Sequence, residues 1–215
     1  MTEHKIVHNG DDCPLVLIFQ GMDDMVFRKG EKHRKSLPYL YYNLLSESNL
    51  KLNYIFFKDN AQSYYDGDYD DIENTISTYI KKYKPPYVTS VGQSAGGFAA
   101  LLIGIRNYTL INRVLTIAPQ INLSYYDSGN PLVKHPRITK TKHIPQRNLG
   151  ELQPFPIKVE YWLPTQGDFD KYHFSFIDET DPNLQVVRFQ AGHNIGMGIG
   201  KSKFKEKLLM AIQTQ

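Results

Sequence analysis

The sequence is 215 residues long, with 41% hydrophobic and 22% charged residues and a formal net charge of +3. These values are typical of one soluble globular domain, and the charge is too mild to indicate nucleic-acid binding. Cys13 is the only cysteine, which excludes an intrachain disulfide and a cysteine-rich metal site. Without a signal peptide or an apolar run of membrane-spanning length, the chain is expected to be cytoplasmic and to have no membrane span.

The N-terminal part is expected to form two strands. Residues 5–8 are a candidate first strand, and the turn-forming residues 9–12 predict a hairpin with a second strand over 14–19. The second strand is apolar throughout, which is typical of a strand buried on both faces of a helix-covered sheet. A polar, basic loop over 23–35 follows, and Ser36 is expected to cap the next helix.

Strands and helices alternate in the middle of the chain. A strand is expected over 51–57, and a helix over 72–83 with Asp70 or Asp71 as its cap. The acidic residues before this helix do not have the spacing of a calcium-binding loop. Further strands are expected over 86–91 and 114–119. This alternation predicts a parallel sheet with right-handed crossovers.

The central motif is Gly92-Gln93-Ser94-Ala95-Gly96, which lies between the apolar strand over 86–91 and an apolar helix over 98–105. A Gly-x-Ser-x-Gly segment between a strand and a helix is the setting of a nucleophile elbow. The two glycines allow strand and helix to approach closely, and the helix N-terminus faces any negative charge that forms at the serine. The alternative interpretation is a flexible glycine-rich loop.

Residues 122–155 interrupt the alternation with a polar, proline-containing insertion. Five basic residues and no acidic residue lie within 134–147, which indicates either a lid or substrate loop that recognises an anion, or a solvated insertion. The remaining elements resume the pattern. We expect a strand over 157–162, a loop over 165–170, a helix over 171–177, a strand over 184–189 and an amphipathic helix over 203–212.

A serine nucleophile needs a base and a third group that orients the base. Of the seven histidines, His193 alone follows directly on a predicted strand, in a glycine-flanked loop at the same sheet edge as Ser94. The orienting acid should follow the preceding strand, where Asp170 is the preferred candidate and Asp168 the alternative. The segment is expected to be an extended loop, and at most one of the two is expected to point at the imidazole.

The oxyanion of an acyl-transfer reaction needs two amide donors. One is expected to be the backbone amide of Ala95, which follows the nucleophile. The other is expected in the loop after Phe19, from the amide of Met22 or of Gly21.

In the order Ser94, Asp170, His193, and in the elbow motif, the sequence resembles the α/β-hydrolase superfamily over nearly its whole length. The resemblance implies one domain over 1–215 with a mostly parallel central sheet, helices on both faces and a short lid over 122–155. Family members often have Gly-x-x-Asp after the acid strand, which Gly167 to Asp170 matches. They often have His-Gly at the oxyanion loop, where this sequence has Gln20-Gly21. The short lid and this loop are also similar to bacterial enzymes of the fold that add or remove acetyl groups on surface glycans.

Three functions are compatible with these residues. The first is hydrolysis of a carboxylic, acetyl-type ester through an acyl-enzyme, with a small-molecule or glycan ester as substrate and no cofactor or metal. The second is an O-acetyltransferase that passes the acyl group to a sugar or polysaccharide hydroxyl, with acetyl-CoA as donor. The third is a catalytically silent binding protein on the same fold, which the presence of all three residues in the expected order disfavours.

Overall fold

The structure is a computed structural model that describes residues 2–21, 39, 41–61, 63–126 and 143–213. Met22, Ser36 and residues 134–142 of the basic segment therefore lie outside the described residues.

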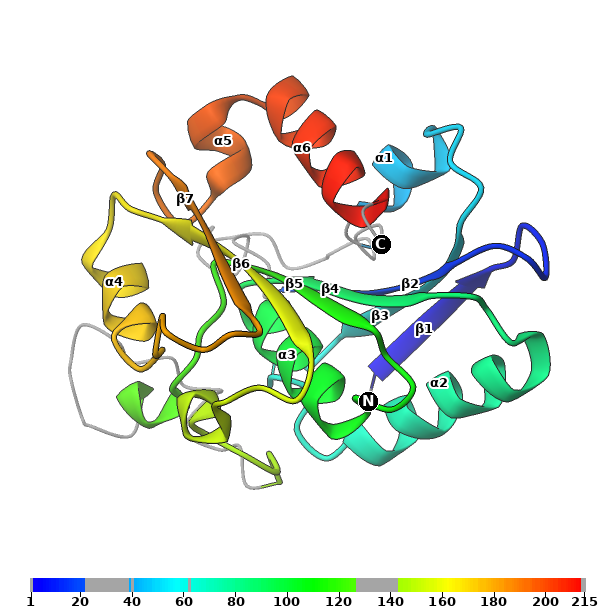
Figure 1. Cartoon of the computed structure of the whole chain (residues 1–215), viewed down its shortest axis with the longest axis horizontal. Helices are drawn as coiled ribbons and strands as arrows, with labels where there is room; N and C mark the ends of the chain where they lie inside the picture. The colour runs from blue at the N-terminus through cyan, green and yellow to red at the C-terminus, as the bar shows by residue number, and fades with distance from the viewer. Residues whose placement is uncertain (1, 22–38, 40, 62, 127–142, 214–215) are drawn as a thin grey trace, which may run out of the picture.

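Seven strands form one sheet in the order β1-β3-β2-β4-β5-β6-β7 (Figure 1). All neighbours are parallel except β1, which is antiparallel to β3. The mostly parallel sheet predicted from the alternating pattern is confirmed. The strands are β1 (Thr2–Val7), β2 (Leu15–Phe19), β3 (Asn53–Asp59), β4 (Val88–Gln93), β5 (Arg113–Ile117), β6 (Lys158–Pro164) and β7 (Leu184–Phe189).

The predicted hairpin between the first two strands is wrong, because β1 pairs with β3 and not with β2. The turn between β1 and β2 is fastened to the start of β3 by the side chain of Asn53. Its Oδ1 accepts from the amide of Asn9 at 2.7 Å, and its Nδ2 donates to the carbonyl of Gly10 at 2.8 Å. The apolar β2 thereby takes an interior place between β3 and β4, where both of its faces are buried.

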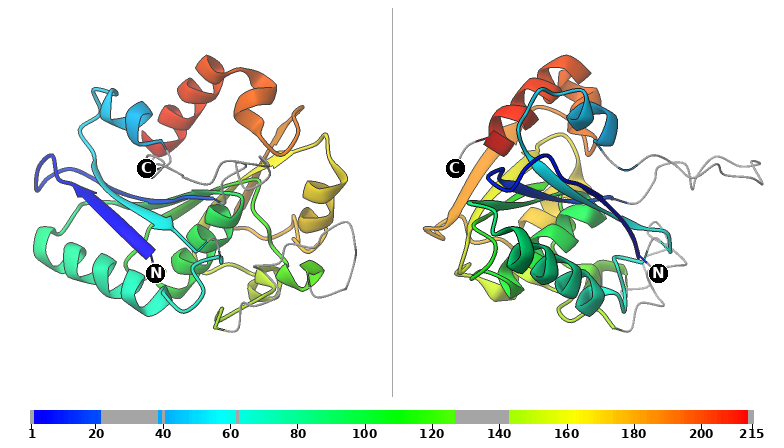
Figure 2. Two further views of the ribbon diagram at one scale, coloured as in Figure 1. Left: turned by 180° about the vertical axis from the view of Figure 1, so that it is seen from behind. Right: turned by 90° about the vertical axis from the view of Figure 1, so that its right-hand side faces the viewer.

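Helices cover both faces of the sheet, as Figures 1 and 2 show. On one face, α2 and α3 pack on Leu15, Leu17 and Phe19 of β2. On the other face, α1 and α6 pack on Val16 and Ile18 of the same strand. Because the side chains of β2 alternate between the two faces of the sheet, this strand contributes to both hydrophobic cores. The helices are α1 (Tyr42–Ser46), α2 (Tyr69–Tyr83), α3 (Ala95–Arg106), α4 (Asp168–Phe174), α5 (Ile195–Ile199) and α6 (Lys201–Gln213).

Helices α1 and α2 are among the helices that begin elsewhere than the sequence predicts. Helix α1 begins at Tyr42, because Tyr41 has a left-handed backbone with φ 59° that cannot belong to a helix. Helix α2 begins at Tyr69, so Asp70 and Asp71 lie within its first turn and do not cap it. Carboxylates in a first turn still interact favourably with the positive end of the helix dipole.

The described ends of the insertion over 122–155 lie side by side. The amide of Leu123 donates to the carbonyl of Arg147 at 2.8 Å, and the amide of Leu149 donates to the carbonyl of Ile121 at 2.9 Å. Short 3-10 helices follow at Leu123–Tyr126 and Leu149–Leu152. The insertion therefore leaves and rejoins the domain at one place, and its role as a lid stays a prediction.

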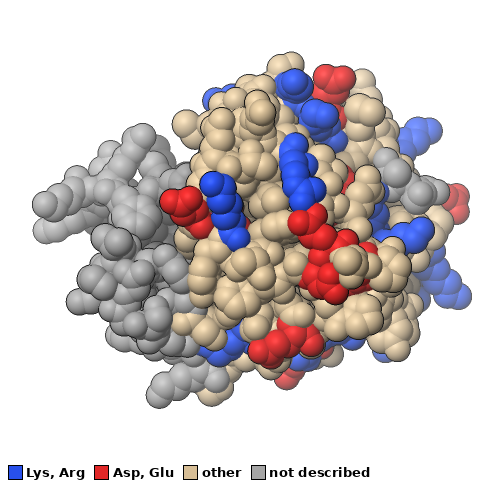
Figure 3. Space-filling view, turned by 60° about the vertical axis from the view of Figure 1, so that its left-hand side comes forward, with Lys and Arg blue, Asp and Glu red and all other residues tan. Residues whose placement is uncertain are grey.

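One face of the molecule carries charges of both signs. Figure 3 shows Lys and Arg side chains spread over this face and a group of Asp and Glu side chains gathered near its centre. In the described part of the chain, no helix has both the length and the apolar character needed to cross a membrane.

Candidate active site

Ser94 lies at a sharp turn between β4 and α3, with φ 56° and ψ −122°. This backbone conformation is strained for a residue with a side chain and requires a tightly packed surrounding. A Cβ atom on Gly92 would lie 2.0 Å from the carbonyl oxygen of Gly96, and one on Gly96 would lie 2.2 Å from that of Phe19. The amide of Ser94 donates to the carbonyl of Ile117 on β5 at 2.9 Å. The two glycines of the motif are therefore steric requirements of the turn.

His193 lies in the loop between β7 and α5. Like Ser94, it follows the carboxyl end of a parallel strand. Its Nε2 is 2.9 Å from Ser94 Oγ, and its Nδ1 is 2.7 Å from Asp170 Oδ1. The loop is held by a hydrogen bond from the amide of Gln166 to the carbonyl of Ala191 at 2.9 Å. The structure thus joins Ser94, His193 and Asp170 in one hydrogen-bonded chain, which is the geometry of a nucleophile, a base and an orienting acid.

Asp170, and not Asp168, is the carboxylate that reaches the imidazole. Both lie in the first turn of α4 and not in the extended loop that the sequence predicts. Successive α-helical residues are about 100° apart, so these two side chains point to nearly opposite sides. Asp170 is 3% exposed, whereas the side chain of Asp168 is fully exposed and lies 3.6 Å from the ammonium of Lys171.

The residues predicted to donate to an oxyanion lie beside Ser94 where the structure describes them. Ala95 is the first residue of α3, and the first amides of a helix have no partner within the helix. A Cβ atom on Gly21 would lie 3.4 Å from Ser94 Cβ, so the backbone after β2 passes directly beside the elbow. Met22, the other candidate donor in this loop, is outside the described residues.

Tyr65 holds the backbone at the end of β2 in place. No sequence pattern pointed to this residue. Its hydroxyl lies 2.9 Å from the carbonyl oxygen of Gln20 and 3.1 Å from that of Phe57. Burial, and next the negative charge of Asp59, raise the pKa of this hydroxyl well above its ordinary value. Tyr65 is therefore a neutral donor that fixes the end of β2. Nothing in its residue type or spacing signals this role.

His173 is a second buried histidine close to the site. It is fully buried, and its Nδ1 accepts a hydrogen bond from the amide of Asn122 at 3.4 Å. The ring of Phe169 lies edge-on against both His173 and His193. Burial, and next the nearby charge of His193, lower the pKa of His173 from 6.5 to about 3. It is therefore neutral at physiological pH and lies outside the hydrogen-bonded chain.

Tyr41 connects the start of α1 to the elbow. Its hydroxyl donates to Gln93 Oε1 at 2.7 Å, and burial raises its pKa. Gln93 is the residue before Ser94, so this bond holds the motif from the α1 side of the sheet. Within the described residues, no group of three or more His, Cys, Asp or Glu side chains could hold a metal ion.

The sequence matches no protein-family model and no curated protein. Solved structures do match the fold over nearly the whole chain. A lipase-esterase related protein from Clostridium acetobutylicum is similar with a TM-score of 0.62 and 16% identity, over 97% of this chain and 98% of that one. An esterase from Pyrococcus furiosus has a TM-score of 0.61 and 12% identity, over 96% and 84% of the two chains.

A third similar structure is the capsule O-acetyltransferase of Neisseria meningitidis serogroup A. Its TM-score is 0.59 and its identity 16%, over 99% of this chain and 91% of that one. Together with the mostly parallel sheet, these likenesses decide the architecture. The chain has the α/β-hydrolase fold. In this α/β-hydrolase fold, Ser94, Asp170 and His193 follow β4, β6 and β7. All three residues therefore lie at the carboxyl ends of parallel strands.

Proposed function

We propose that this protein is a serine-dependent acyl-transfer enzyme in which Ser94 is the nucleophile, His193 the general base and Asp170 the orienting acid. The observation that carries the proposal is the hydrogen-bonded chain from Ser94 Oγ through His193 to Asp170, with distances of 2.9 and 2.7 Å. Both lie within the range needed for proton transfer and orientation. The strained backbone of Ser94 adds support, because such strain concentrates at functional sites.

In the first step, Ser94 Oγ attacks the carbonyl carbon of an ester while His193 Nε2 takes its proton. The buried Asp170 carboxylate accepts from Nδ1–H, which directs Nε2 at the serine and stabilises the imidazolium that forms. The amide of Ala95 and an amide of the loop after β2 donate to the oxyanion. His193 then returns the proton to the departing alkoxide oxygen, which leaves an acyl group on Ser94.

In the second step, a hydroxyl compound attacks the acyl-enzyme, and His193 again removes and returns the proton. Attack by water gives hydrolysis of a carboxylic ester, which we propose as the main reaction, with an acetyl-type ester as substrate. Attack by a sugar hydroxyl gives O-acetyl transfer. This second candidate is supported by the likeness to a capsule O-acetyltransferase over 99% of the chain, and its acyl donor would be acetyl-CoA.

Active-site labelling tests the shared chemistry. We expect a fluorophosphonate probe to label the protein on Ser94, and Ser94→Ala to abolish the labelling with an unchanged circular dichroism spectrum. Ser175→Ala, a matched change at an exposed serine, should be labelled like the wild type. Absent labelling of the wild type would favour the silent binding protein, and labelling that persists in Ser94→Ala would place the nucleophile elsewhere.

A product assay separates the two candidate reactions. Purified protein is incubated with acetyl esters or acetyl-CoA, with and without sugar acceptors, and products are identified by mass spectrometry. Free acetate formed at the same rate with and without acceptor supports hydrolysis. An acetylated sugar, formed by the wild type and not by Ser94→Ala, supports transfer.

A further inference from the structure

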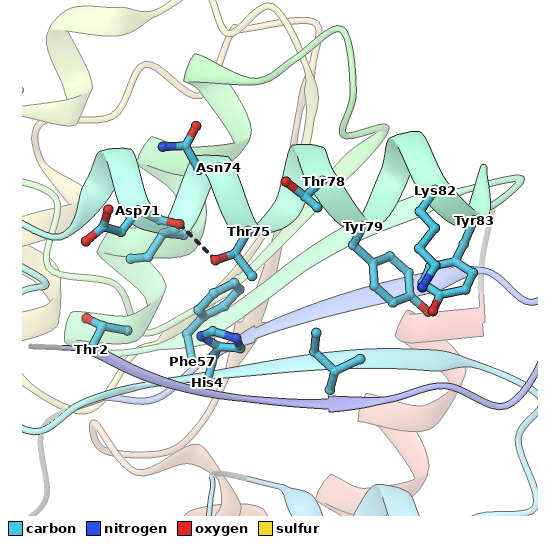
Figure 4. A pocket seen from close by; sticks show the side chains of 12 residues that line it. Thr2, His4, Phe57, Asp71, Asn74, Thr75, Thr78, Tyr79, Lys82 and Tyr83 are labelled. Atoms are coloured by element: carbon cyan, nitrogen blue, oxygen red, sulfur yellow. Dashed lines mark hydrogen bonds between the residues drawn. The ribbon is translucent and has the colours of Figure 1, made fainter.

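The strand β1 forms one edge of the sheet and leaves a groove between itself and α2. The groove has a volume of about 740 Å³, and Figure 4 shows Thr2 and His4 pointing from β1 toward the side of α2. Ile6 lines the same groove and is 45% exposed. In the described part of the chain, no strand pairs with the outer edge of β1. An open edge of this kind presents unpaired amides and carbonyls to any strand that fits it.

The other face of β1 carries two opposite charges. Lys5 Nζ lies 3.7 Å from the centre of the Tyr42 ring, and Val7 packs against the core beneath α1, so the odd-numbered residues lie on the α1 face. Glu3 and Lys5 are therefore on one face, two residues apart. Neither of them forms an ion pair with another described residue.

We propose that β1 pairs antiparallel with β1 of a second copy of this chain and so joins the two sheets into one. Residues directly opposite each other in an antiparallel pair point to the same face. A two-fold axis between the two strands must therefore pass beside a single residue, so that even-numbered residues oppose even-numbered ones. Within β1, an axis at His4 or Lys5 pairs five residues of each copy (2–6 or 3–7), whereas an axis at Glu3 or Ile6 pairs only three (2–4 or 5–7).

The number of paired residues and the charges together select one register. An axis at Glu3 places two carboxylates opposite each other, and an axis at Lys5 places two ammonium groups opposite each other. An axis at His4 places Glu3 opposite Lys5 of the second copy, and the symmetry makes this pair twice. It also places Thr2 opposite Ile6, so that the groove faces of the two copies adjoin. The strand is thus complementary to itself, which is what a two-fold interface requires.

The opposite edge of the sheet lacks this property. Strand β7 carries one charged residue, Arg188, which forms an ion pair with Glu179 of its own chain. No two-fold register of β7 can therefore bring opposite charges together. The self-complementary pattern is specific to β1, which favours a second copy of the chain as the occupant of this edge.

Charge exchange tests the proposal on the full-length chain by sedimentation velocity over a wide concentration range. We expect a reversible dimer for the wild type. Lys5→Glu should weaken it about tenfold to a hundredfold, because each cross-strand pair becomes repulsive and the axis applies the change twice. The double variant Glu3→Lys with Lys5→Glu should recover most of the affinity. Lys203→Glu, the same charge change at an exposed position of α6, should dimerise like the wild type.

Cross-linking tests the register itself. In a Cys13→Ser background, His4→Cys places two cysteines directly opposite each other, within reach of a disulfide. We expect rapid cross-linking of this variant under mild oxidation and little for Thr2→Cys, whose opposite residue is Ile6. A wild type that is monomeric at every concentration would overturn the proposal. So would a dimer indifferent to Lys5→Glu, or equal cross-linking of the two cysteine variants.

Discussion

Asp168 and Asp170 show how one turn of helix gives two similar residues different environments. Asp170 is buried against His193, and Asp168 projects into solvent beside Lys171. The sequence favours Asp170 as the acid but places both residues in an extended loop. In an extended segment, two residues with this spacing point to the same side, whereas in a helical turn they point to nearly opposite sides, so the helix separates the two carboxylates. Asp170 lies against His193 in the structure, and its role as the acid stays a prediction. The face of α4 that points into the protein depends on how this helix packs. Residue spacing alone does not predict that packing.

Asp170→Asn should preserve the shape of the site and lower kcat by up to about 10⁴-fold, because an amide favours the wrong imidazole tautomer. Asp168→Asn should change kcat less than tenfold, since an exposed ion pair contributes little. Steady-state kinetics of both purified variants on one ester substrate is the measurement. Equal losses for the two variants, or a larger loss for Asp168→Asn, would contradict the assignment of Asp170.

Three parts of the chain hold Ser94 in place. Helix α3 begins directly after Ser94, and the carbonyl of Ile117 on β5 accepts a hydrogen bond from the amide of Ser94. In the segment between β3 and α2, the hydroxyl of Tyr65 donates to the carbonyl of Gln20 at the end of β2. Asp59 Oδ2 accepts from the amides of Ser63 and Tyr65, which shapes the turn that carries the tyrosine. The backbone that passes beside Ser94 is thus fixed by a turn more than 40 residues further along the chain.

Tyr65→Phe should slow the chemistry on Ser94, because the carbonyl of Gln20 loses its hydroxyl donor and the adjoining loop loosens. We expect kcat on an activated ester, and the fluorophosphonate labelling rate, to fall at least tenfold more than in the control. The matched control is Tyr69→Phe, which also removes a buried hydroxyl, one that donates to the carbonyl of Tyr64 at 2.8 Å. Each variant should lose about 1–3 kcal/mol of unfolding free energy. Equal activity in the two variants would leave Tyr65 with a purely structural role.

The order of strands and helices along the whole molecule was predictable, because it depends on periodicity and on turn residues. The apolar run of β2, the elbow and the last strand, Leu184–Phe189, all lie where the sequence places them. The pairing of β1 was not predictable. The turn over 9–12 suits a hairpin or a crossover equally well, and in the structure the side chain of Asn53, distant in the sequence, fastens it to the start of β3. Long-range contacts of this kind leave no local pattern.

The stability of the whole molecule should depend on pH through His173. This side chain is fully buried and held neutral, with a pKa lowered from 6.5 to about 3, first by burial and then by the charge of His193. Between pH 6.5 and about pH 3, His173 binds a proton in the unfolded chain but not in the folded chain. Its contribution to stability is therefore complete above pH 6.5 and is lost progressively as the pH falls toward 3.

We expect this group to lower the unfolding free energy by roughly 2 kcal/mol between pH 6.5 and about pH 4.5, because the unfolded histidine is already half protonated at pH 6.5. His173→Asn keeps an acceptor for the amide of Asn122 and cannot titrate, and His173→Phe fills the site without titrating. Both variants should be less stable than the wild type at pH 7, yet lose less stability on acidification. Urea unfolding at a series of pH values measures this difference in slope. If both His173 variants keep the wild-type slope, His173 is not the group through which acid destabilises the fold.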